Sequence, residues 1–328
     1  MLKLPRRQFL HLTAGAAAFP AVARIAKAQA YPTRPVRVIV PFAPGGQTDV
    51  VARIIAQKLS ERLGKQFYVE NVPGAGGNIG AGRAAQAAPD GYTIIVVDGI
   101  AFAGNPSLYN KVPYDPAKDF EPVGIGATTM MVLAVHPGVA ARTVQDLVAL
   151  IKANSGKYSY ASAGVGTGAH LTGELFRNSL GLDLVHVPYN GGGPAIGATL
   201  AGHTPISIGS PAATIPQVKD GKLRALAVSG KTRLRELPDV PTMREAGFTD
   251  VECNVWLGIL VPAGTPKDII ALLNQEIVRA DALPDVQDHL VALGFEPTAA
   301  TPEELAVLIK TEVPKWANVI RAAGIKAN

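Results

Sequence analysis

Short apolar runs alternate with amphipathic runs along most of the chain. An apolar run of about five residues bounded by Gly, Pro or Asn is typical of a buried strand, and apolar positions three and four apart are typical of a helix. The predicted strands are 36–40, 67–72, 92–97, 158–162, 185–188, 205–209, 223–229 and 254–261, with one longer apolar run over 123–135. The predicted helices are 48–63, 79–88, 144–154, 170–180, 194–201, 213–219, 267–280 and 302–323, with a further short helix that ends at Gly247. This alternation favours an α/β fold with parallel strands.

The order of these units indicates two lobes. The chain is expected to leave the first lobe near residue 125 and to return near 252, just before the late apolar strand 254–261. Lobe 1 would then comprise residues 31–124 plus 253–328, and lobe 2 residues 125–252. Two crossings between lobes form a hinge with a cleft beside it.

The first 30 residues are expected to be a signal peptide rather than part of the fold. Residues 6–10 read Arg-Arg-Gln-Phe-Leu, a mild apolar stretch follows, and residues 28–30 read Ala-Gln-Ala. Twin arginines before an apolar stretch and a small-x-small cleavage site are typical of twin-arginine (Tat) export. Pro20 and Arg24 interrupt the apolar part, which is too short to span a membrane. We therefore expect a periplasmic protein.

Removing this leader changes the charge balance. The whole chain has 31 basic and 26 acidic residues and a net charge of +5, and the leader holds five of the basic residues and no acidic one. The remaining chain is neutral and has no basic run, so we expect no nucleic-acid partner. Cys253 is the only cysteine, so an exported form has no internal disulfide.

The most informative segment follows the first predicted strand. Residues 40–51 read Val-Pro-Phe-Ala-Pro-Gly-Gly-Gln-Thr-Asp-Val-Val. A strand leads into a Pro- and Gly-rich loop, and Thr48 or Asp49, both good N-cap residues, opens a helix. Free N–H groups in such a loop, at the positive end of a helix, can hold a carboxylate or phosphate.

A second segment has the same arrangement. Residues 158–171 read Tyr-Ser-Tyr-Ala-Ser-Ala-Gly-Val-Gly-Thr-Gly-Ala-His-Leu. Gly164, Gly166 and Gly168 leave the backbone open, and Ser162 and Thr167 add hydroxyl donors. Two such loops in a two-lobed chain predict capture of a small anion. A third Gly-rich turn, residues 189–194, either lines the cleft or only turns the chain.

Other chemistry is less well supported. Ser162 with His170 lacks the nucleophile elbow of a hydrolase, because Tyr160 stands where the first Gly is needed. The histidines lack metal-ligand spacing, so we expect neither a catalytic residue nor a metal site. The loop from Gly74 to Gly80 is close to a dinucleotide fingerprint, although Pro73 and one extra residue alter its spacing. The alternative function is therefore an exported oxidoreductase that binds a nucleotide cofactor at this loop.

Several motifs together resemble the Bug family, the TctC-like substrate-binding receptors of tripartite tricarboxylate transporters. They include Tyr-Pro-Thr-Arg-Pro-Val-Arg at 31–37, the segments at 40–49 and 70–80, Ala-Pro-Asp-Gly-Tyr at 88–92, Asn-Pro-Ser-Leu-Tyr at 105–109, His-Val-Pro-Tyr-Asn-Gly at 186–191 and Leu-Pro-Asp-Val-Pro-Thr at 237–242. The resemblance implies a two-lobed periplasmic-binding-protein (Venus-flytrap, type II) fold with two chain crossings. It also implies a monomer without a cofactor, which passes a small carboxylate to membrane transporter subunits.

In such receptors the loops matching 42–49 and 162–170 hold the carboxylate through backbone amides and ordered water. Where the family often has Asp, this chain has Gly209, so we expect a carboxylate without an amino group. The expected ligand contacts are Phe42, Ala43, Pro44, Gly45, Gly46, Thr48, Asp49, Ala101, Ser162, Gly164, Gly166, Thr167, His170, Tyr189, Asn190 and Gly209.

Overall fold

The computed structural model describes residues 31–327. The expected signal peptide, residues 1–30, lies outside the described residues. Arg34–Asn328 forms one compact unit, and its strands form two five-stranded sheets. Within the described residues, no helix is both long and apolar enough to cross a membrane.

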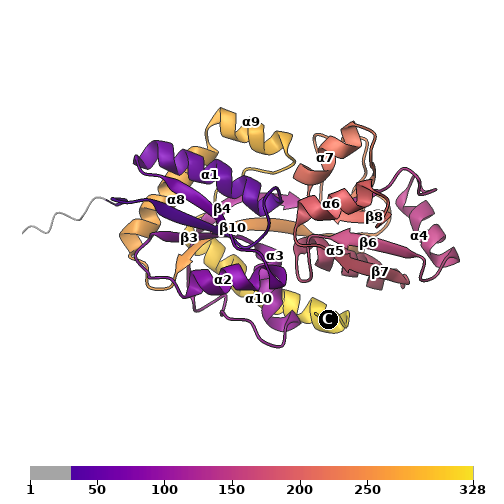
Figure 1. Ribbon diagram of the computed structural model, residues 1–328, viewed down its shortest axis with the longest axis horizontal. Coiled ribbons are helices and arrows are strands. Elements are labelled where there is room, and N and C mark those ends of the chain that lie inside the picture. The colour runs from indigo at the N-terminus through magenta and orange to yellow at the C-terminus, as the bar shows by residue number, and fades with distance from the viewer. Residues whose placement is uncertain (1–30, 328) are drawn as a thin grey trace, which may run out of the picture. The chain divides into compact units, whose positions relative to one another are not determined.

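The first sheet combines strands from both ends of this unit (Figure 1). Its order is β2-β1-β3-β10-β4, with β1 (Val36–Val40), β2 (Phe67–Asn71), β3 (Thr93–Asp98), β4 (Phe120–Met130) and β10 (Asn254–Pro262). β1 pairs in parallel with β2 and β3, whereas β10 lies antiparallel between β3 and β4. Every residue of β3 is buried, as expected for an inner strand covered on both faces.

The second sheet comes from one continuous stretch. Its order is β7-β6-β8-β5-β9, with β5 (Val132–Val135), β6 (Tyr158–Ser162), β7 (Leu184–Pro188), β8 (Ile206–Gly209) and β9 (Arg224–Val228). β6 is parallel to β7 and β8, and β5 is antiparallel to β8 and β9. The predicted α/β architecture is therefore confirmed.

Helices flank both sheets (Figure 1). Around the first sheet lie α1 (Gln47–Leu63), α2 (Asn78–Ala85), α3 (Gly99–Leu108), α8 (Lys267–Asp281), α9 (Pro284–Ala292) and α10 (Pro302–Ala322). Around the second lie α4 (Val144–Ala153), α5 (Gly168–Ser179), α6 (Gly192–Leu200) and α7 (Pro211–Lys219), and short 3₁₀ turns occupy Ala75–Gly77 and Thr249–Val251. Thr143 and Thr301 begin α4 and α10 with capping boxes, as their sequences favour.

The structure differs from the predicted elements at four places. The predicted short helix that ends at Gly247 is wrong, because residues 243–247 form a turn. Helices α3 and α9 were not predicted, and the apolar run 123–135 was predicted as one element. The structure divides this run into β4 and β5, which belong to different sheets. The chain thus leaves the first sheet after Met130 and returns to it at Asn254. The division into lobes at residues 124 and 252 stays a prediction; the first of these positions lies inside β4.

Candidate functional site

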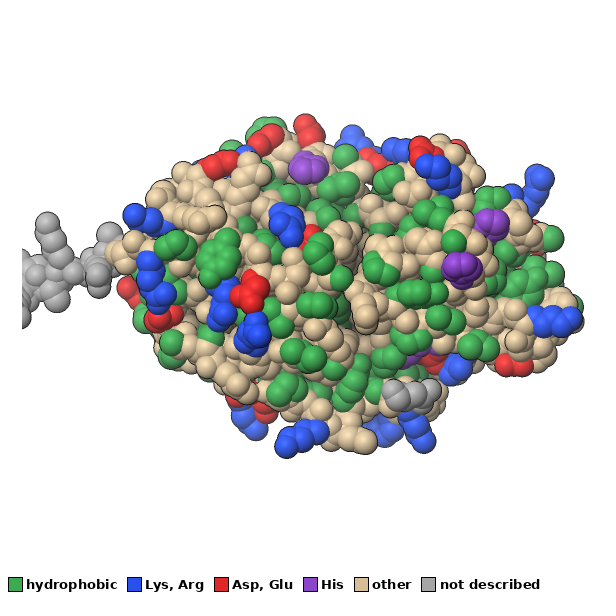
Figure 2. Space-filling model, in the orientation of Figure 1, with side chains coloured by type: hydrophobic (Ala, Val, Ile, Leu, Met, Phe, Trp, Pro, Cys, Tyr) green, Lys and Arg blue, Asp and Glu red, His purple; other side chains and the backbone are tan. Residues whose placement is uncertain are grey.

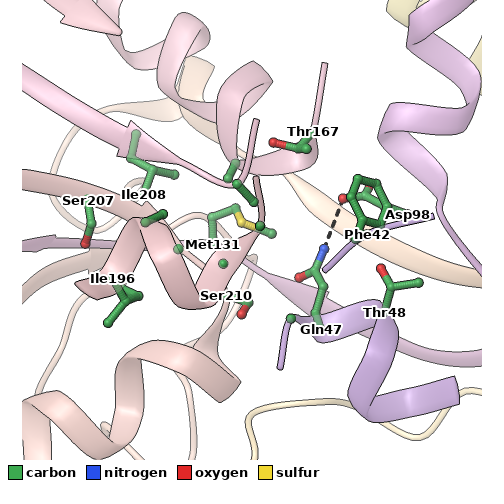
Figure 3. A pocket seen from close by; sticks show the side chains of 17 residues that line it. Phe42, Gln47, Thr48, Asp98, Met131, Thr167, Ile196, Ser207, Ile208 and Ser210 are labelled. Carbon is green, nitrogen blue, oxygen red and sulfur yellow. Dashed lines mark hydrogen bonds between the residues drawn. The ribbon is translucent and has the colours of Figure 1, made fainter. Parts of the chain in front are cut away.

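A cavity of about 530 Å³ lies between the loops of the two sheets (Figure 3). Phe42, Gln47 and Thr48 reach it from the first lobe. Thr167 and Ser210 reach it from the second.

Five helices begin at the cavity wall. Their N-cap residues are Gly46 of α1, Asp98 of α3, Thr167 of α5, Gly191 of α6 and Ser210 of α7. The first backbone N–H groups of a helix have no partner within the helix, and the helix dipole makes that end positive. The Asp98 carboxylate accepts the first N–H groups of α3 and the Gly168 N–H of α5. The starts of α1, α6 and α7 are not capped by Asp98, and they present neutral groups that suit an anion.

The part of the chain that the structure describes places no basic side chain in this wall. Among the described residues that line the cavity, none is Lys, Arg or His. On the face drawn in Figure 2, the surface around the junction of α1 and α6 is mainly apolar or uncharged, and blue side chains lie mostly away from it. An anion held here would be bound by N–H and O–H donors rather than by an ion pair.

Among the described residues that line the cavity, Asp98 is the one acidic side chain. Its Oδ1 accepts hydrogen bonds from the N–H groups of Ile100 and Ala101 at 3.0 and 3.2 Å. Its Oδ2 accepts from Gln47 Nε2 at 3.1 Å and from the Gly168 N–H, in the second lobe, at 3.2 Å. Burial raises the pKa of Asp98 and these hydrogen bonds oppose that rise, with a net upward shift.

Asp98 therefore joins the starts of α1, α3 and α5 across the cleft. Neither Asp98 nor Gln47 was among the contacts expected from the sequence. A signal for Asp98 existed, since it directly follows the predicted strand 92–97 and Asp is a favoured N-cap residue, but the helix that it caps was not predicted. Nothing in one sequence shows that Gly168 and Gln47 meet it there.

The β1–α1 loop is held by Asp49 from within the first lobe. The Asp49 carboxylate accepts from the Gly45 N–H at 3.0 Å, from Asn71 Nδ2 at 2.9 Å and from the Arg53 guanidinium at 2.9 Å. Burial raises the pKa of Asp49, but the hydrogen bonds from Arg53, Gly45 and Asn71 outweigh it, and the net shift is downward. Asp49 is thus used in shaping the loop and is not part of the cavity wall.

The β6–α5 loop is shaped in a similar way by buried side chains. Thr167 Oγ1 donates to the Gly164 carbonyl at 2.7 Å, and His170 Nδ1 accepts from the Gly166 N–H at 3.1 Å. His170 stacks on His186 with ring centroids 4.2 Å apart. Burial is the main reason that the pKa falls to about 3 for His170 and to about 4 for His186. Both imidazoles are therefore neutral at physiological pH.

The structure brings some of the expected contacts together at the central cavity and places others behind or beside it. Phe42, Gly46, Thr48, Thr167 and Gly209 line it. The loop residues Ala43, Pro44, Gly45 and Asp49, together with Ser162, Gly166 and His170, do not. Gly164, Tyr189 and Asn190 line an adjacent cavity of about 750 Å³, and Ala101 lines a smaller one beside Phe42 and Asp98.

Gly209 leaves no space for a larger residue. A Cβ at this position would lie 2.9 Å from Thr214 Oγ1 and 3.2 Å from Ile196 Cδ1. An acidic side chain therefore does not fit here without rearrangement of both neighbours. This agrees with the expectation that no acid at 209 meets the ligand.

The loop from Gly74 to Gly80 contacts the second lobe. Gly76 has φ of 63°, and a Cβ on it would lie 2.2 Å from the Val165 carbonyl oxygen. Tyr109 Oη donates to the same carbonyl at 3.0 Å. Close packing between lobes thus accounts for glycine at position 76, without invoking a dinucleotide.

Known proteins resemble this chain over nearly its whole length. Residues 51–325 match the family described as "Tripartite tricarboxylate transporter family receptor". The structure of periplasmic binding protein BugD is 37% identical, covers 91% of this chain and 100% of its own, and superposes with a TM-score of 0.87.

Two further structures carry ligands. R. palustris Rpa4515 with adipate is 33% identical, with a TM-score of 0.87 over 90% of this chain and 99% of its own. MatC from Rhodopseudomonas palustris with bound malate is 34% identical, with a TM-score of 0.84 over 88% of this chain and 100% of its own. These similarities confirm the two-lobed periplasmic-binding-protein fold and the resemblance to Bug proteins. The chain belongs to the TctC family of tripartite tricarboxylate transporter receptors.

Proposed function

We propose that the protein is an extracytoplasmic receptor that encloses a small organic carboxylate in the central cavity. The observation that carries this proposal is the meeting of the N-termini of α1, α6 and α7, none of them capped by Asp98, at a cavity that no cation of the described chain lines. Neutral donors hold an anion without leaving an unpaired buried cation when the cavity is empty. The adipate and malate bound by two relatives support the same class of ligand.

The ligand site comprises Phe42, Gly46, Thr48 and Thr167, with Gly209 in the wall of the second lobe. Lobe closure brings the β1–α1 and β6–α5 loops onto opposite sides of the ligand. In this proposal the protein makes and breaks no bond. It releases the carboxylate to membrane subunits of a tripartite tricarboxylate transporter, as the family membership suggests.

We also propose that the protein acts as a periplasmic monomer, exported by the Tat route. The periplasmic location is supported by relatives such as BugD. The twin arginines at 6 and 7 are the reason for naming the Tat route. Replacement of both by lysine should stop export if this route is used, and continued export would exclude it.

Thermal unfolding of purified protein with a panel of carboxylates and with NAD tests the ligand class. A carboxylate at about a hundredfold excess over Kd should add roughly 2.7 kcal/mol to the free energy of unfolding. For a protein of this size that is about 5 °C in Tm. Stabilisation by NAD and by no carboxylate would favour the alternative oxidoreductase and refute the receptor.

A further inference from the structure

The amide of Gln47 has a fixed orientation in the cavity wall. Its Nε2 donates to Asp98 Oδ2 at 3.1 Å. The Asp98 carboxylate accepts three more hydrogen bonds, from the N–H groups of Ile100, Ala101 and Gly168. A carboxylate has about four acceptor positions, so four N–H donors leave none for a proton. A rotated Gln47 amide would set its oxygen against Asp98, and Nε2 therefore stays on the Asp98 side.

This orientation turns Gln47 Oε1 towards the cavity. Figure 3 shows the nitrogen directed at Asp98 and the oxygen directed to the side where Ser210 and Met131 lie. Gln47 is only 9% exposed, and no residue in the range 31–327 pairs with Oε1. A buried acceptor without a donor is costly. Gln47 Oε1 is thus a hydrogen-bond acceptor in the cavity wall whose orientation is set by Asp98.

The charge of the site decides which donor suits this acceptor. An ammonium group would need a carboxylate partner, because a buried charge without one is expensive. Asp98 is the one acidic residue among the described residues of this wall, and its acceptor positions are occupied. Gly209 supplies no second acid. A neutral hydroxyl needs only the neutral Gln47 oxygen.

We propose that Gln47 Oε1 accepts a hydrogen bond from a hydroxyl group of the ligand, so that the receptor prefers hydroxycarboxylates to their unsubstituted and amino counterparts. This inference rests on the proposed carboxylate receptor and assigns a specificity-determining residue within it. Asp98 acts as a positioning residue, because it sets which atom of Gln47 faces the ligand. Ser210 Oγ is also unpaired in the described chain, but a hydroxyl can donate or accept and does not discriminate in the same way.

Calorimetric titration with matched ligands tests the preference. The series are succinate, malate and aspartate, and propionate, lactate and alanine, each measured on wild type, Gln47→Met and Ser210→Ala. In wild type the hydroxy member should bind about tenfold more tightly than the unsubstituted one, which equals about 1.4 kcal/mol. Gln47→Met should bring this ratio close to one, and Ser210→Ala should keep it.

A second variant covers the case in which Gln47→Met does not fold. Asp98→Asn introduces an amide donor, which lets the Gln47 amide turn and offer N–H to the cavity. The hydroxyl preference should then fall as well, a change in ligand ranking that mere loosening of the site would not cause. A preference that survives in Gln47→Met or is lost in Ser210→Ala overturns the inference, as does tighter binding of the amino members. Binding of none of the six ligands would instead count against the proposed function.

Discussion

Alanine at position 166 should weaken ligand binding while leaving the fold intact. Gly166 has φ of 84°, and a Cβ there would lie 2.1 Å from Asn105 Oδ1 in the other lobe. Asn105 cannot turn aside freely, because its Nδ2 donates to the Gly76 carbonyl at 2.9 Å and to Asn78 Oδ1 at 3.0 Å. The substitution therefore opposes closure of the lobes.

The magnitude follows from these contacts. The left-handed backbone at Gly166 costs alanine about 1 kcal/mol, equally in the open and closed states. Closure additionally displaces Asn105 and two buried hydrogen bonds, each worth about 1 kcal/mol. The closed state should thus lose about 2 kcal/mol relative to the open one, which weakens Kd about thirtyfold.

Calorimetry with the carboxylate that gives the largest thermal shift measures this effect. Gly181→Ala is the matched control, because Gly181 has φ of 59° but no atom within 4 Å of its Cβ position. Both variants should lose about 2 °C in Tm from backbone strain, and only Gly166→Ala should lose affinity. Equal affinity of the two variants would refute the account of closure at Gly166.

Three other outcomes are expected. The pKa values of His170 and His186 lie near 3 and 4 in the folded state and near 6.5 in the unfolded chain. The free energy of unfolding should therefore fall as pH drops below about 6.5, by about 1.4 kcal/mol per pH unit for each histidine that is protonated in the unfolded chain but not in the folded protein. Urea unfolding between pH 7 and 5 that shows no change would contradict this. Gly209→Ala should cost about 1–3 kcal/mol by overpacking against Thr214, and an unchanged Tm would show that the neighbours yield freely. Asp49→Ala should lower Tm by several degrees and weaken binding through the β1–α1 loop, and calorimetry of the folded variant at wild-type affinity would remove Asp49 from that role.

Local patterns in the sequence were sufficient to predict the strand–loop–helix form of residues 40–51 and 158–171. A strand, a Gly-rich turn and a helix start lie within about a dozen residues in each, so no long-range information is needed. The predicted start of the first helix at Thr48 or Asp49 is wrong, because Gly46 is the N-cap of α1 and both residues lie inside the helix. Helix α3 was missed because Gly99, Gly104 and Pro106 are poor helix formers. The Asp98 cap at its start and burial of the helix override that propensity.

Long-range pairing explains the remaining differences. Met131 separates β4 from β5 within one apolar run, and hydrophobicity does not reveal that the two halves join different sheets. The proposed role of Gln47 in the site could not be predicted from the sequence for the same reason. Its role depends on Asp98, 51 positions further along the chain, and on the meeting of two loops across the cleft. The spacing of residues along the chain indicates neither the Gln47–Asp98 contact nor the meeting of the two loops.

The placement of β10 between β3 and β4 has a consequence for the order in which the protein is made. The second sheet uses residues 132–228 without interruption, so its strands are complete while the ribosome still holds the C-terminal part of the chain. The first sheet lacks an inner strand until Asn254–Pro262 has emerged. During synthesis the N-terminal lobe therefore finishes last, although its first strands are translated first. A truncation before residue 254 should leave the middle of the chain able to fold and the N-terminal strands without their partner.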